Sequence, residues 1–456
     1  MRIEKDTLGE IKVPDKAYYG AQTQRALNNF KASGKPFPLI FIKAFLRLKK
    51  ACAMANADCG KLERSKKDVL VEACERAEGM TEQFKVDLYQ AGAGTSFNMN
   101  VNEVVANIAA EILRKPKGDY SQIHPNDHVN MSQSSNDTFP TASHLAVIWK
   151  ADQLIKVLDD LAGAFEEKSR QFSGIIKTGR THLMDATPVT VGDEFGAYAA
   201  VLKRAAGLLK EGRDNLLEVP LGSTAVGTGA NSPEGFKDKA LQYLSDFTGL
   251  TLKRSQNPFE ALQSRFGLSV FSSYLSELAK ELNRIANDLR LLNSGPVAGL
   301  AEIKLPAVQP GSSIMPGKVN PVMAECLNMI CFRVIGNHDT VSLASQAGQM
   351  ELNVMTPVMT TSILESQELL INYLPDFQKL CVEGIEADQE RCKNLLLLNP
   401  SLATLLATDI GYENAAKLAQ ESLEKKIPVP ELAVKKKLIS KEKARQLFKD
   451  SYDLEP

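Results

Sequence analysis

The sequence lacks the features that mark several common classes of protein. No apolar run approaches the roughly 18 residues that a membrane-spanning helix needs, and the segment from Met1 to Asp6 carries no apolar signal region. The net charge is only −1, which argues against electrostatic binding to nucleic acid or to a membrane surface. We therefore expect a protein with neither a membrane nor a nucleic acid as partner.

Patterns that bind metals and nucleotides are also missing. The five histidines lack zinc-type spacing, and the sequence has neither a GxxxxGK[ST] motif nor a GxGxxG motif after a strand. The seven cysteines are scattered, and none belongs to a CxxC pair. These absences predict no metal and no cofactor, together with reduced, mostly buried thiols in a cytoplasmic protein.

Length and composition are typical of a globular protein with more than one domain. The chain has 456 residues, of which 44% are hydrophobic and 24% are charged. Helix-breaking residues are sparse in the middle of the chain and more frequent on either side. We predict three domains: residues 1–138 with short helices and loops, residues 139–390 with long helices, and residues 391–456 as a small helical domain.

Seven-residue apolar repeats identify the long helices of the middle region. Apolar residues there recur in steps of three and four, so that one seam of each helix faces a partner. Helices with such seams bury them against one another, which predicts a mainly α protein with a central helix bundle. Small residues such as Ala205 and Ala279 allow close approach and favour an oligomer that shares the bundle, with a thick monomeric bundle as the alternative. The repeats run through Leu154, Leu158, Leu161 and Phe165, through Phe195, Ala199, Leu202, Ala206 and Leu209, and through Phe271, Leu275, Leu278, Leu282, Ile285, Leu289 and Leu292.

Four polar segments rich in small residues interrupt the helical pattern. Each has a plain structural explanation as a helix cap or a turn. A cap needs only one polar side chain, however, and these segments hold a surplus of hydroxyls and amides that indicates ligand contacts. The segments are 92–100 with Thr95 and Ser96, 132–138 with Ser134, Ser135 and Asn136, 179–188 as a polar turn between helices with Thr181 and His182, and 311–321 with Ser312, Ser313, Lys318 and Asn320, followed by Glu325.

The segment 311–321 is the most informative of the four. Its glycines and serines give a mobile backbone and a hydroxyl that can reach a substrate, while Pro316 and Pro321 limit the freedom of its ends. Lys318 supplies a positive charge, and Asn320 can donate a hydrogen bond to the same anion. This combination predicts a loop that removes a proton from carbon beside a carboxylate.

The four segments together suit a small dicarboxylate. Lys318 and Asn320 would hold one carboxylate, and the hydroxyls of Thr95, Ser134 and Ser135 would hold the other. Removing a proton beside this second carboxylate builds charge on it, so neutral donors aimed at its oxygens stabilise the transition state. An activated serine is a base of suitable strength, and closure of its loop would exclude water.

The sequence GSSIMPGKVNP at 311–321 resembles the signature of the aspartase/fumarase superfamily of lyases. The similarity extends from the first residues through all four polar segments and weakens only near the C-terminus. The resemblance implies a three-domain helical fold whose central helices join those of three further subunits in a homotetramer. It also implies active sites built from three different subunits, which accounts for polar segments that lie far apart in the sequence.

The same resemblance implies a role for each candidate residue. Ser312 is the expected general base, and Glu325 is the acid that pairs with His182. Asn136, Thr181 and His182 are expected to face the leaving group, while the carboxylate held by the hydroxyls passes through an aci form. The expected catalytic residues are Ser312, His182 and Glu325, and the expected substrate-binding residues are Thr95, Ser96, Ser134, Ser135, Asn136, Thr181, Ser313, Lys318 and Asn320.

Two reactions of this superfamily fit the residues: deamination of L-aspartate to fumarate, and interconversion of fumarate and L-malate. Segments 92–96 and 347–355 are similar to aspartase-type members, whereas 134–139 and 185–188 are more similar to fumarase-type members. Residues 263–266 depart from both patterns. The first two segments favour the aspartase reaction, and the fumarase reaction is the alternative.

A non-catalytic structural protein on the same scaffold is a remote third possibility. Such a protein would keep its helical seams while its catalytic residues were lost. Ser312, Lys318 and His182 are all present, which argues for an enzyme.

Overall fold

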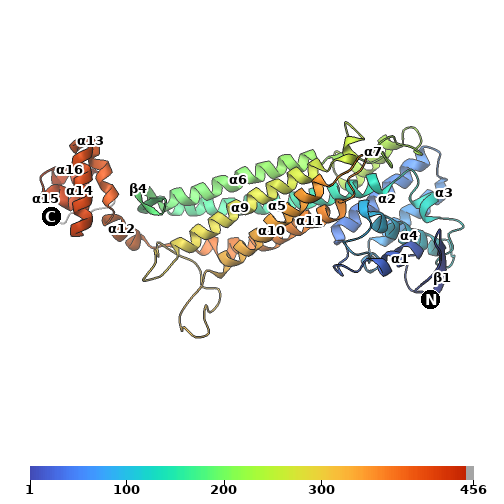
Figure 1. Ribbon diagram of the computed structural model, residues 1–456, viewed down its shortest axis with the longest axis horizontal. Coiled ribbons are helices and arrows are strands. Elements are labelled where there is room, and N and C mark those ends of the chain that lie inside the picture. Colours follow the sequence, from blue (N-terminus) through green and yellow to red (C-terminus); the bar gives the residue numbers. More distant parts are fainter. Residues whose placement is uncertain (448–456) are drawn as a thin grey trace. The chain divides into compact units, whose positions relative to one another are not determined.

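The protein is mainly helical, as the apolar repeats predict (Figure 1). The computed structural model describes residues 1–447, so residues 448–456 of the predicted C-terminal domain lie outside the described part, as does the side chain of Gln446. Five helices have 25 residues or more, and they occupy the region where the repeats were found. They are α5 (Ser135–Gln171), α6 (Val191–Asn215), α9 (Phe266–Leu292), α10 (Val322–Gln346) and α11 (Thr356–Leu380).

The chain divides into two compact units, each assembled from three separate segments. Every one of the five long helices contributes residues to both units. The division into three domains with boundaries at residues 138 and 390 stays a prediction. Unit 1 comprises Met1–Ile155, Gly207–Glu277 and Phe332–Leu370, and unit 2 comprises Lys156–Ala206, Leu278–Cys331 and Ile371–Pro456.

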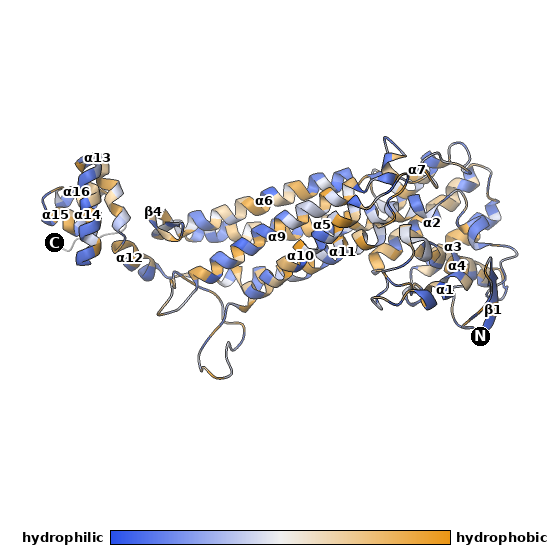
Figure 2. Cartoon of the chain, viewed as in Figure 1, coloured by the Kyte–Doolittle hydropathy of each residue, from blue (hydrophilic) through white to orange (hydrophobic). Residues whose placement is uncertain are grey.

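The predicted seam positions form the core of the long helices. Phe271 and Leu289 of α9 are fully buried, and all the other repeat residues named above are buried as well. Along these helices apolar and polar residues alternate around the helix axis (Figure 2). Polar bonds also cross between helices: in unit 1, the hydroxyl of Thr360 in α11 donates to that of Ser143 in α5 at 2.7 Å. The expectation of a helix bundle is therefore confirmed.

The remainder of unit 1 surrounds a helix that is buried on nearly all sides. This helix, α4 (Thr95–Ile112), contacts α1 and α3, and α2 in turn contacts α3 and α7. A cluster of buried phenylalanine rings joins α2, α4 and the start of α5, and the rings of Phe41 and Phe139 lie 4.8 Å apart. The other elements of unit 1 are β1 (Arg2–Asp6), β2 (Gly9–Val13), α1 (Ala21–Asn29), α2 (Leu39–Asp58), α3 (Arg64–Ala77), η1 (Thr81–Gln83), η2 (Gly92–Gly94), η3 (Pro125–Val129), β5 (Glu218–Val219), α7 (Phe236–Thr248), β6 (Lys253–Arg254) and α8 (Glu260–Gln263).

Unit 2 carries a β-hairpin where the sequence predicts a polar turn between two helices. Strands β3 (Ile176–Thr181) and β4 (Met184–Thr190) pair antiparallel between α5 and α6. Threonine recurs along both strands, with Ile176 in β3 and Val189 in β4, and these β-branched residues favour the extended backbone, so the predicted turn is only the tip of the hairpin. The remaining elements are β7 (Ile303–Lys304), η4 (Val382–Gly384), β8 (Glu386–Ala387), α12 (Gln389–Leu397), η5 (Pro400–Leu406), α13 (Ala407–Ile410), α14 (Tyr412–Lys425), α15 (Val429–Lys435) and α16 (Lys441–Leu447).

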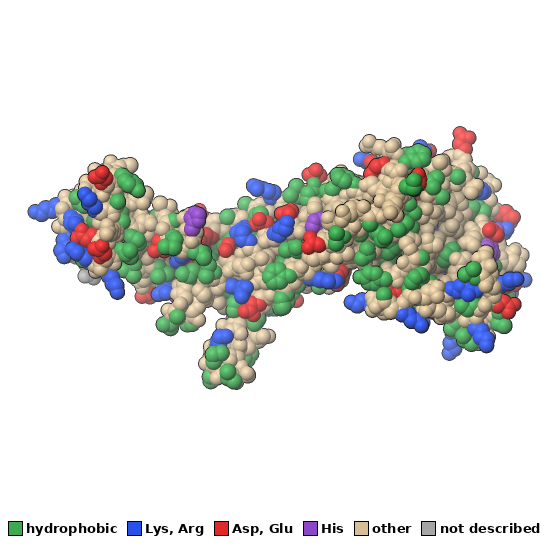
Figure 3. Space-filling view, in the orientation of Figure 1, with side chains coloured by type: hydrophobic (Ala, Val, Ile, Leu, Met, Phe, Trp, Pro, Cys, Tyr) green, Lys and Arg blue, Asp and Glu red, His purple; other side chains and the backbone are tan. Residues whose placement is uncertain are grey.

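The surface and the thiols agree with the composition. All seven cysteines are free, and five of them are buried, as expected. Hydrophobic side chains are scattered among charged ones on the face drawn in Figure 3. Among residues 1–447, no helix is long and apolar enough to cross a membrane, and no cluster of three or more acidic, histidine or cysteine side chains has the arrangement of a metal site.

Candidate functional site

Two of the predicted hydroxyls meet in unit 1 at the starts of two helices. Thr95 is the first residue of α4, Ser135 is the first residue of α5, and their hydroxyl oxygens lie 3.1 Å apart. Thr95 is exposed at this point, whereas Ser135 is buried. Because the N-terminus of a helix is the positive end of its dipole, two hydroxyls placed at two helix starts can receive an anion. Ser96 follows Thr95 in α4 and is half-buried.

Glycine allows the two helix starts to come this close. Gly94 has a left-handed φ of +69°, and a Cβ atom there would lie 1.9 Å from Cδ2 of Phe139. Phe139 is fully buried among the other phenylalanine rings, so it cannot move aside without disturbing them. The Gly92–Gly94 turn therefore places Thr95 against Ser135 through packing, and not only through helix capping.

The start of α5 is fixed by the buried carboxylate of Asp137. Asp137 accepts hydrogen bonds from the backbone N–H groups of Ser134, Gly222 and Thr224 at 2.9–3.0 Å. Burial raises the pKa of Asp137 to about 6, against the lowering effect of these N–H groups. The carboxylate thereby ties the Ser134–Asn136 segment to a loop far away in the sequence.

That loop, residues 220–229, is a part of the site region that sequence reasoning missed. Its Ala225 carbonyl accepts a 2.8 Å hydrogen bond from Nδ2 of Asn136, so the Oδ1 atom of Asn136 is left for other partners. Among the described residues, the buried hydroxyls of Ser223 and Thr224 find no hydrogen-bond partner. The glycines at 222, 227 and 229, all with positive φ, were the available signal in the sequence.

Sequence reasoning also missed Lys49, a fully buried lysine behind the hydroxyl pair. Its ammonium donates to side-chain oxygens of Asn98, Asn130 and Gln133 at 2.8–3.0 Å. Asn98 lies one helical turn beyond Thr95, and Gln133 lies in the segment that precedes Ser135. Burial lowers the pKa of Lys49 to about 7. The lysine cross-links the two segments, but a Lys in a helical pattern gives no such signal.

In unit 2, the histidine candidate lies at the tip of the β-hairpin. His182 and Leu183 have positive φ values of 55° and 60°, a backbone that Asn and Gly adopt more readily than these residues do. Thr181, His182 and Leu183 are all exposed. Strain of this kind persists where the surrounding structure enforces it, and it is concentrated at functional positions. The hairpin thus presents His182 outward.

The predicted base loop is closed at its foot by its own polar residues. The backbone N–H of Gly311 donates to the Lys318 carbonyl at 2.9 Å, and Nδ2 of Asn320 donates to the Gly311 carbonyl at 2.6 Å. Nζ of Lys318 donates to Oδ1 of Asn320 at 2.9 Å, so the predicted carboxylate ligands lie together. Ser313 is exposed beyond them, next to Ser312.

The hydroxyl of Ser312 sits in a nest of backbone donors. The N–H groups of Ile314 and Met315 donate to its Oγ at 3.3 and 3.0 Å. Donors of this kind stabilise a negatively charged oxygen. This geometry was not visible in the sequence, although the glycine-flanked pattern indicated a loop with accessible N–H groups.

The structure therefore gathers the candidates into separate groups. Thr95, Ser134, Ser135 and Asn136 belong to unit 1, whereas the hairpin, the Ser312 loop and Glu325 belong to unit 2. Glu325 lies half-buried in the first turn of α10, and within residues 1–447 no hydrogen bond or ion pair joins it to His182. The pairing of these two residues stays a prediction.

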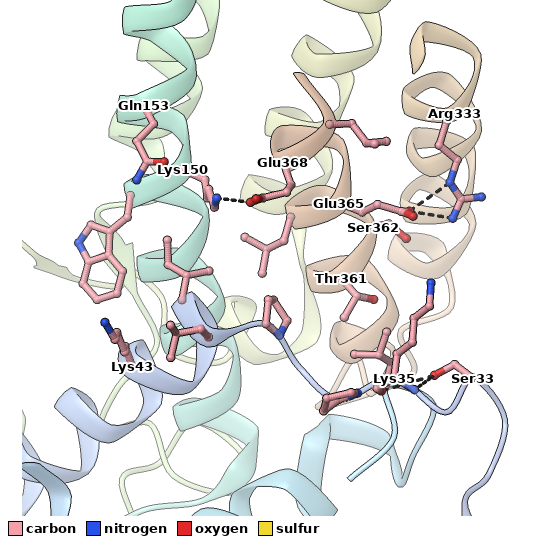
Figure 4. Close-up of a pocket in the computed structure, with 18 of the residues that line it drawn as sticks. Ser33, Lys35, Lys43, Lys150, Gln153, Arg333, Thr361, Ser362, Glu365 and Glu368 are labelled. Carbon is pink, nitrogen blue, oxygen red and sulfur yellow. Dashed lines mark hydrogen bonds and ion pairs between the residues drawn. The ribbon is translucent and has the colours of Figure 1, made fainter. Parts of the chain in front are cut away.

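A cavity of about 1210 Å³ in unit 1 lies apart from these groups. None of the residues predicted for the site lines it, and Figure 4 shows that two of its carboxylates are already engaged. Glu365 pairs with Arg333 at 2.7 Å, and Glu368 pairs with Lys150. We assign this cavity no part in the chemistry.

Comparisons with known proteins agree with the motif. A family profile described as lyase matches residues 9–336, and one described as fumarase C C-terminus matches residues 402–450. An aspartate ammonia-lyase from a Bacillus species is 44% identical over 450 residues, which cover 98% of this chain and 96% of that protein. A class II fumarate hydratase from Haemophilus ducreyi is 44% identical over 449 residues, covering 98% and 97%.

Solved structures are similar over the whole chain as well. The crystal structure titled fumarate lyase:delta crystallin from Brucella melitensis, bound to cobalt, has a TM-score of 0.95 and 44% identity, covering 98% of each chain. A class II fumarase from Schistosoma mansoni has a TM-score of 0.95 and 36% identity, covering 99% of this chain and 98% of that one.

Proposed function

This chain belongs to the aspartase/fumarase superfamily of lyases, and from that premise we propose that it deaminates L-aspartate reversibly to fumarate and ammonia. The alternative is a class II fumarate hydratase, which forms L-malate from fumarate and water. Relatives of both kinds are equally similar to the chain, so overall identity does not favour either reaction.

A contact in unit 1 carries the preference for aspartate. The two segments that are similar to aspartase-type members adjoin each other: the N–H of Ala93 donates to the Val354 carbonyl at 2.8 Å. Nearby, Gly348 has no room for a side chain, because a Cβ atom would lie 2.8 Å from the Gln263 carbonyl. Both aspartase-like segments thus meet two residues before Thr95, and we propose that this contact forms one wall of the site.

Residues 263–266, which depart from both patterns, are held to the same wall. Buried Arg265 donates to the Thr356 hydroxyl at 2.8 Å and to the Asn353 carbonyl at 3.3 Å. We propose that this arginine stabilises the wall, because its donors bind backbone and hydroxyl oxygens and no carboxylate partner of it is found among the described residues.

In the proposed reaction, Ser312 removes the proton from the carbon beside the carboxylate held by Thr95 and Ser135. The two N–H groups that bind Oγ of Ser312 stabilise its deprotonated form. The electron pair of the broken C–H bond moves into the carboxylate, whose aci form is stabilised by the hydroxyls and by the positive ends of the two helix dipoles. Lys318 and Asn320 hold the other carboxylate of the substrate.

The electron pair then returns to form the carbon–carbon double bond of fumarate, and the carbon–nitrogen bond breaks. We propose that Asn136, Thr181 and His182 face the departing ammonia, with Glu325 supporting the histidine. The orientation of Asn136 supports this role, because its Nδ2 is occupied by Ala225 and its Oδ1 can accept a hydrogen bond from an ammonium group. Ser96, Ser134 and Ser313 complete the polar surface.

We further propose that the protein is a homotetramer whose active sites combine segments of three subunits. Exposed apolar side chains on α10 support this assembly: Met329 is 63% exposed, Phe332 is 60% and Leu343 is 64%. Large apolar side chains in one helix seldom remain in water. The outward-facing hairpin tip has the same explanation, because a neighbouring subunit would receive His182.

The experiment is to follow fumarate by its ultraviolet absorbance after adding L-aspartate or L-malate to the purified protein, with Ser312→Ala as the control. A signal from aspartate that the variant loses supports the proposal. A signal from malate alone would replace the ammonia-lyase assignment with the hydratase, and no signal from either substrate would favour the non-catalytic alternative.

A further inference from the structure

We propose that Arg180, Glu302 and Lys177 form a positioning network that holds the His182 hairpin against the segment leading to the Ser312 loop. All three residues belong to unit 2. The proposal rests on the function proposed above, because it assigns these residues to the alignment of two reacting groups. None of the three is expected to touch the substrate.

The contact between the hairpin and this segment is a two-pronged ion pair. Nη1 of Arg180 donates to Oε2 of Glu302, and Nη2 donates to Oε1, both at 2.8 Å. Glu302 is completely buried. A planar guanidinium that binds both oxygens of a carboxylate fixes its direction as well as its distance. Rotation of strand β3 about this contact is thereby restricted.

Lys177 of the same strand completes the network. Its ammonium lies 3.0 Å from Oε2 of Glu302 and 2.7 Å from Oε1 of Glu194, and the lysine is 1% exposed. Two cations thus face two carboxylates, and their formal charges cancel within the cluster. Such balance is needed because a buried charge without a partner is costly.

The hairpin above the network is strained and irregular. Its tip has positive φ at His182 and Leu183, and its strand register shifts between Thr178 and Arg180. At Gly179, a Cβ atom would lie 2.5 Å from the Thr187 carbonyl, so the strands close tightly there. Arg180 therefore holds strand β3 between the register shift and the tip with positive φ values, where a hairpin without this ion pair would be free to change conformation.

Glu302 in turn belongs to the segment that leads to the Ser312 loop. Its N–H donates to the Leu292 carbonyl, and its own carbonyl accepts from the N–H of Asp388, both at 2.9 Å. Strand β7 follows directly, and the loop begins after it. One carboxylate thus joins the hairpin that carries the proposed leaving-group residues to the segment that leads to the proposed base loop.

Stability alone does not require these charges. Buried ion pairs contribute little more than apolar residues of the same volume, and such replacements often leave stability unchanged. An apolar cluster in the same place would not fix the direction of strand β3 relative to Glu302. The charges are therefore explained better by the orientation of the hairpin than by a gain in stability.

The test is the double variant Arg180→Met/Glu302→Leu in the full-length protein, with Lys203→Met/Glu166→Gln as control. The double variant keeps Lys177 paired with Glu194, so no buried charge is orphaned. The control removes an exposed ion pair of the same unit. We expect kcat to fall about 100-fold, as for a misplacement of about 1 Å, while KM and the unfolding midpoint stay near those of the unmodified protein.

A second variant guards against misfolding of the first. Arg180→Lys keeps the positive charge but loses the two parallel hydrogen bonds of the guanidinium to Glu302. We therefore expect this variant to fold normally and still to show a lowered kcat. Normal kcat in Arg180→Lys, or in a folded double variant, would overturn the proposal.

Hydrogen–deuterium exchange over residues 176–190 separates this inference from the proposed function, because it requires no substrate. Faster exchange at the hairpin tip in the double variant, with no change in the control, is the expected result. Unchanged exchange would refute the positioning network even if the enzyme acts on aspartate, whereas faster exchange in a protein that acts on neither substrate would refute only the reaction.

Discussion

Replacement of Gly94 by Ala tests whether close packing, and not just backbone freedom, sets the position of Thr95. The new Cβ atom would lie 1.9 Å from Cδ2 of Phe139, far inside contact distance. Phe139 has no room to retreat, since its ring lies 4.8 Å from that of Phe41 and 5.6 Å from that of Phe37. The backbone must therefore move, and with it the start of α4.

Two contributions make up the expected loss of stability. A left-handed backbone at a residue with a Cβ atom costs about 1–2 kcal/mol, and overpacking of a filled core costs about 1–3 kcal/mol. Together they predict a loss of roughly 2–5 kcal/mol in the free energy of unfolding. Displacement of Thr95 from Ser135 should also raise KM for the dicarboxylate.

Gly34→Ala is the matched control. Gly34 has φ +68°, almost the same as Gly94, but a Cβ atom there meets nothing within 4 Å. The variant thus carries the backbone cost without the clash. Urea unfolding can be followed by fluorescence of Trp149, the single tryptophan of the chain, which belongs to the same unit as both glycines. Equal shifts of the unfolding midpoint in the two variants would refute the packing argument.

Three further predictions concern the proposed base, a carboxylate ligand and a half-buried histidine of α5. Ser312→Ala should lower kcat by about 100-fold or more. The unfolding midpoint should not shift, because the Ser312 hydroxyl accepts from N–H groups of its own loop. A variant with normal turnover would exclude Ser312 as the base. Lys318→Met should raise KM for the dicarboxylate about 10- to 100-fold, because a charged hydrogen bond contributes roughly 1.5–3 kcal/mol. Initial-rate measurements that give an unchanged KM would contradict the assignment of Lys318 as a carboxylate ligand. Burial lowers the pKa of His144 from 6.5 to about 4, so the folded protein holds it neutral while the unfolded chain protonates it as the pH falls below 6.5. The protonation of His144 should therefore decrease the free energy of unfolding between pH 6.5 and 4, by up to about 1.4 kcal/mol per pH unit. The urea midpoint of His144→Asn should depend less on acid pH than that of the unmodified protein. An identical pH dependence in the two proteins would exclude His144 as the cause.

The helices of this protein could be predicted because their signal is local. The repeat from Phe271 to Leu292 requires only that apolar residues fall on one side of a helix, and every member of it is buried. The polar segments were recognisable for a similar reason, since surplus hydroxyls interrupt a helical pattern. The strands around His182 were not predicted, because short strands with polar residues resemble a turn when no partner strand is known.

The buried residues that hold the polar segments in place could not be identified from a local sequence pattern. Lys49 belongs to a helix with two other lysines, Lys43 and Lys50, and only its burial distinguishes it from them. Glu302 precedes a strand of two residues, and nothing near it indicates that Arg180 and Lys177 will meet it. Contacts over such separations arise from the packing of whole helices, which a single sequence does not specify.

The helical class of this chain and its lyase-type loop with a serine and a lysine could be predicted from the sequence, because both signals are local. The helix seams come from apolar residues three and four positions apart, and the chemistry of the loop comes from one short segment. Tertiary structure alone decided that Thr95 meets Ser135, that Gly94 must be glycine, and that a buried carboxylate joins the hairpin to the base segment. The physical reason is that close packing, which brings together atoms from distant parts of the chain, sets these distances to within an atomic radius, while the local pattern sets only which face of an element is buried.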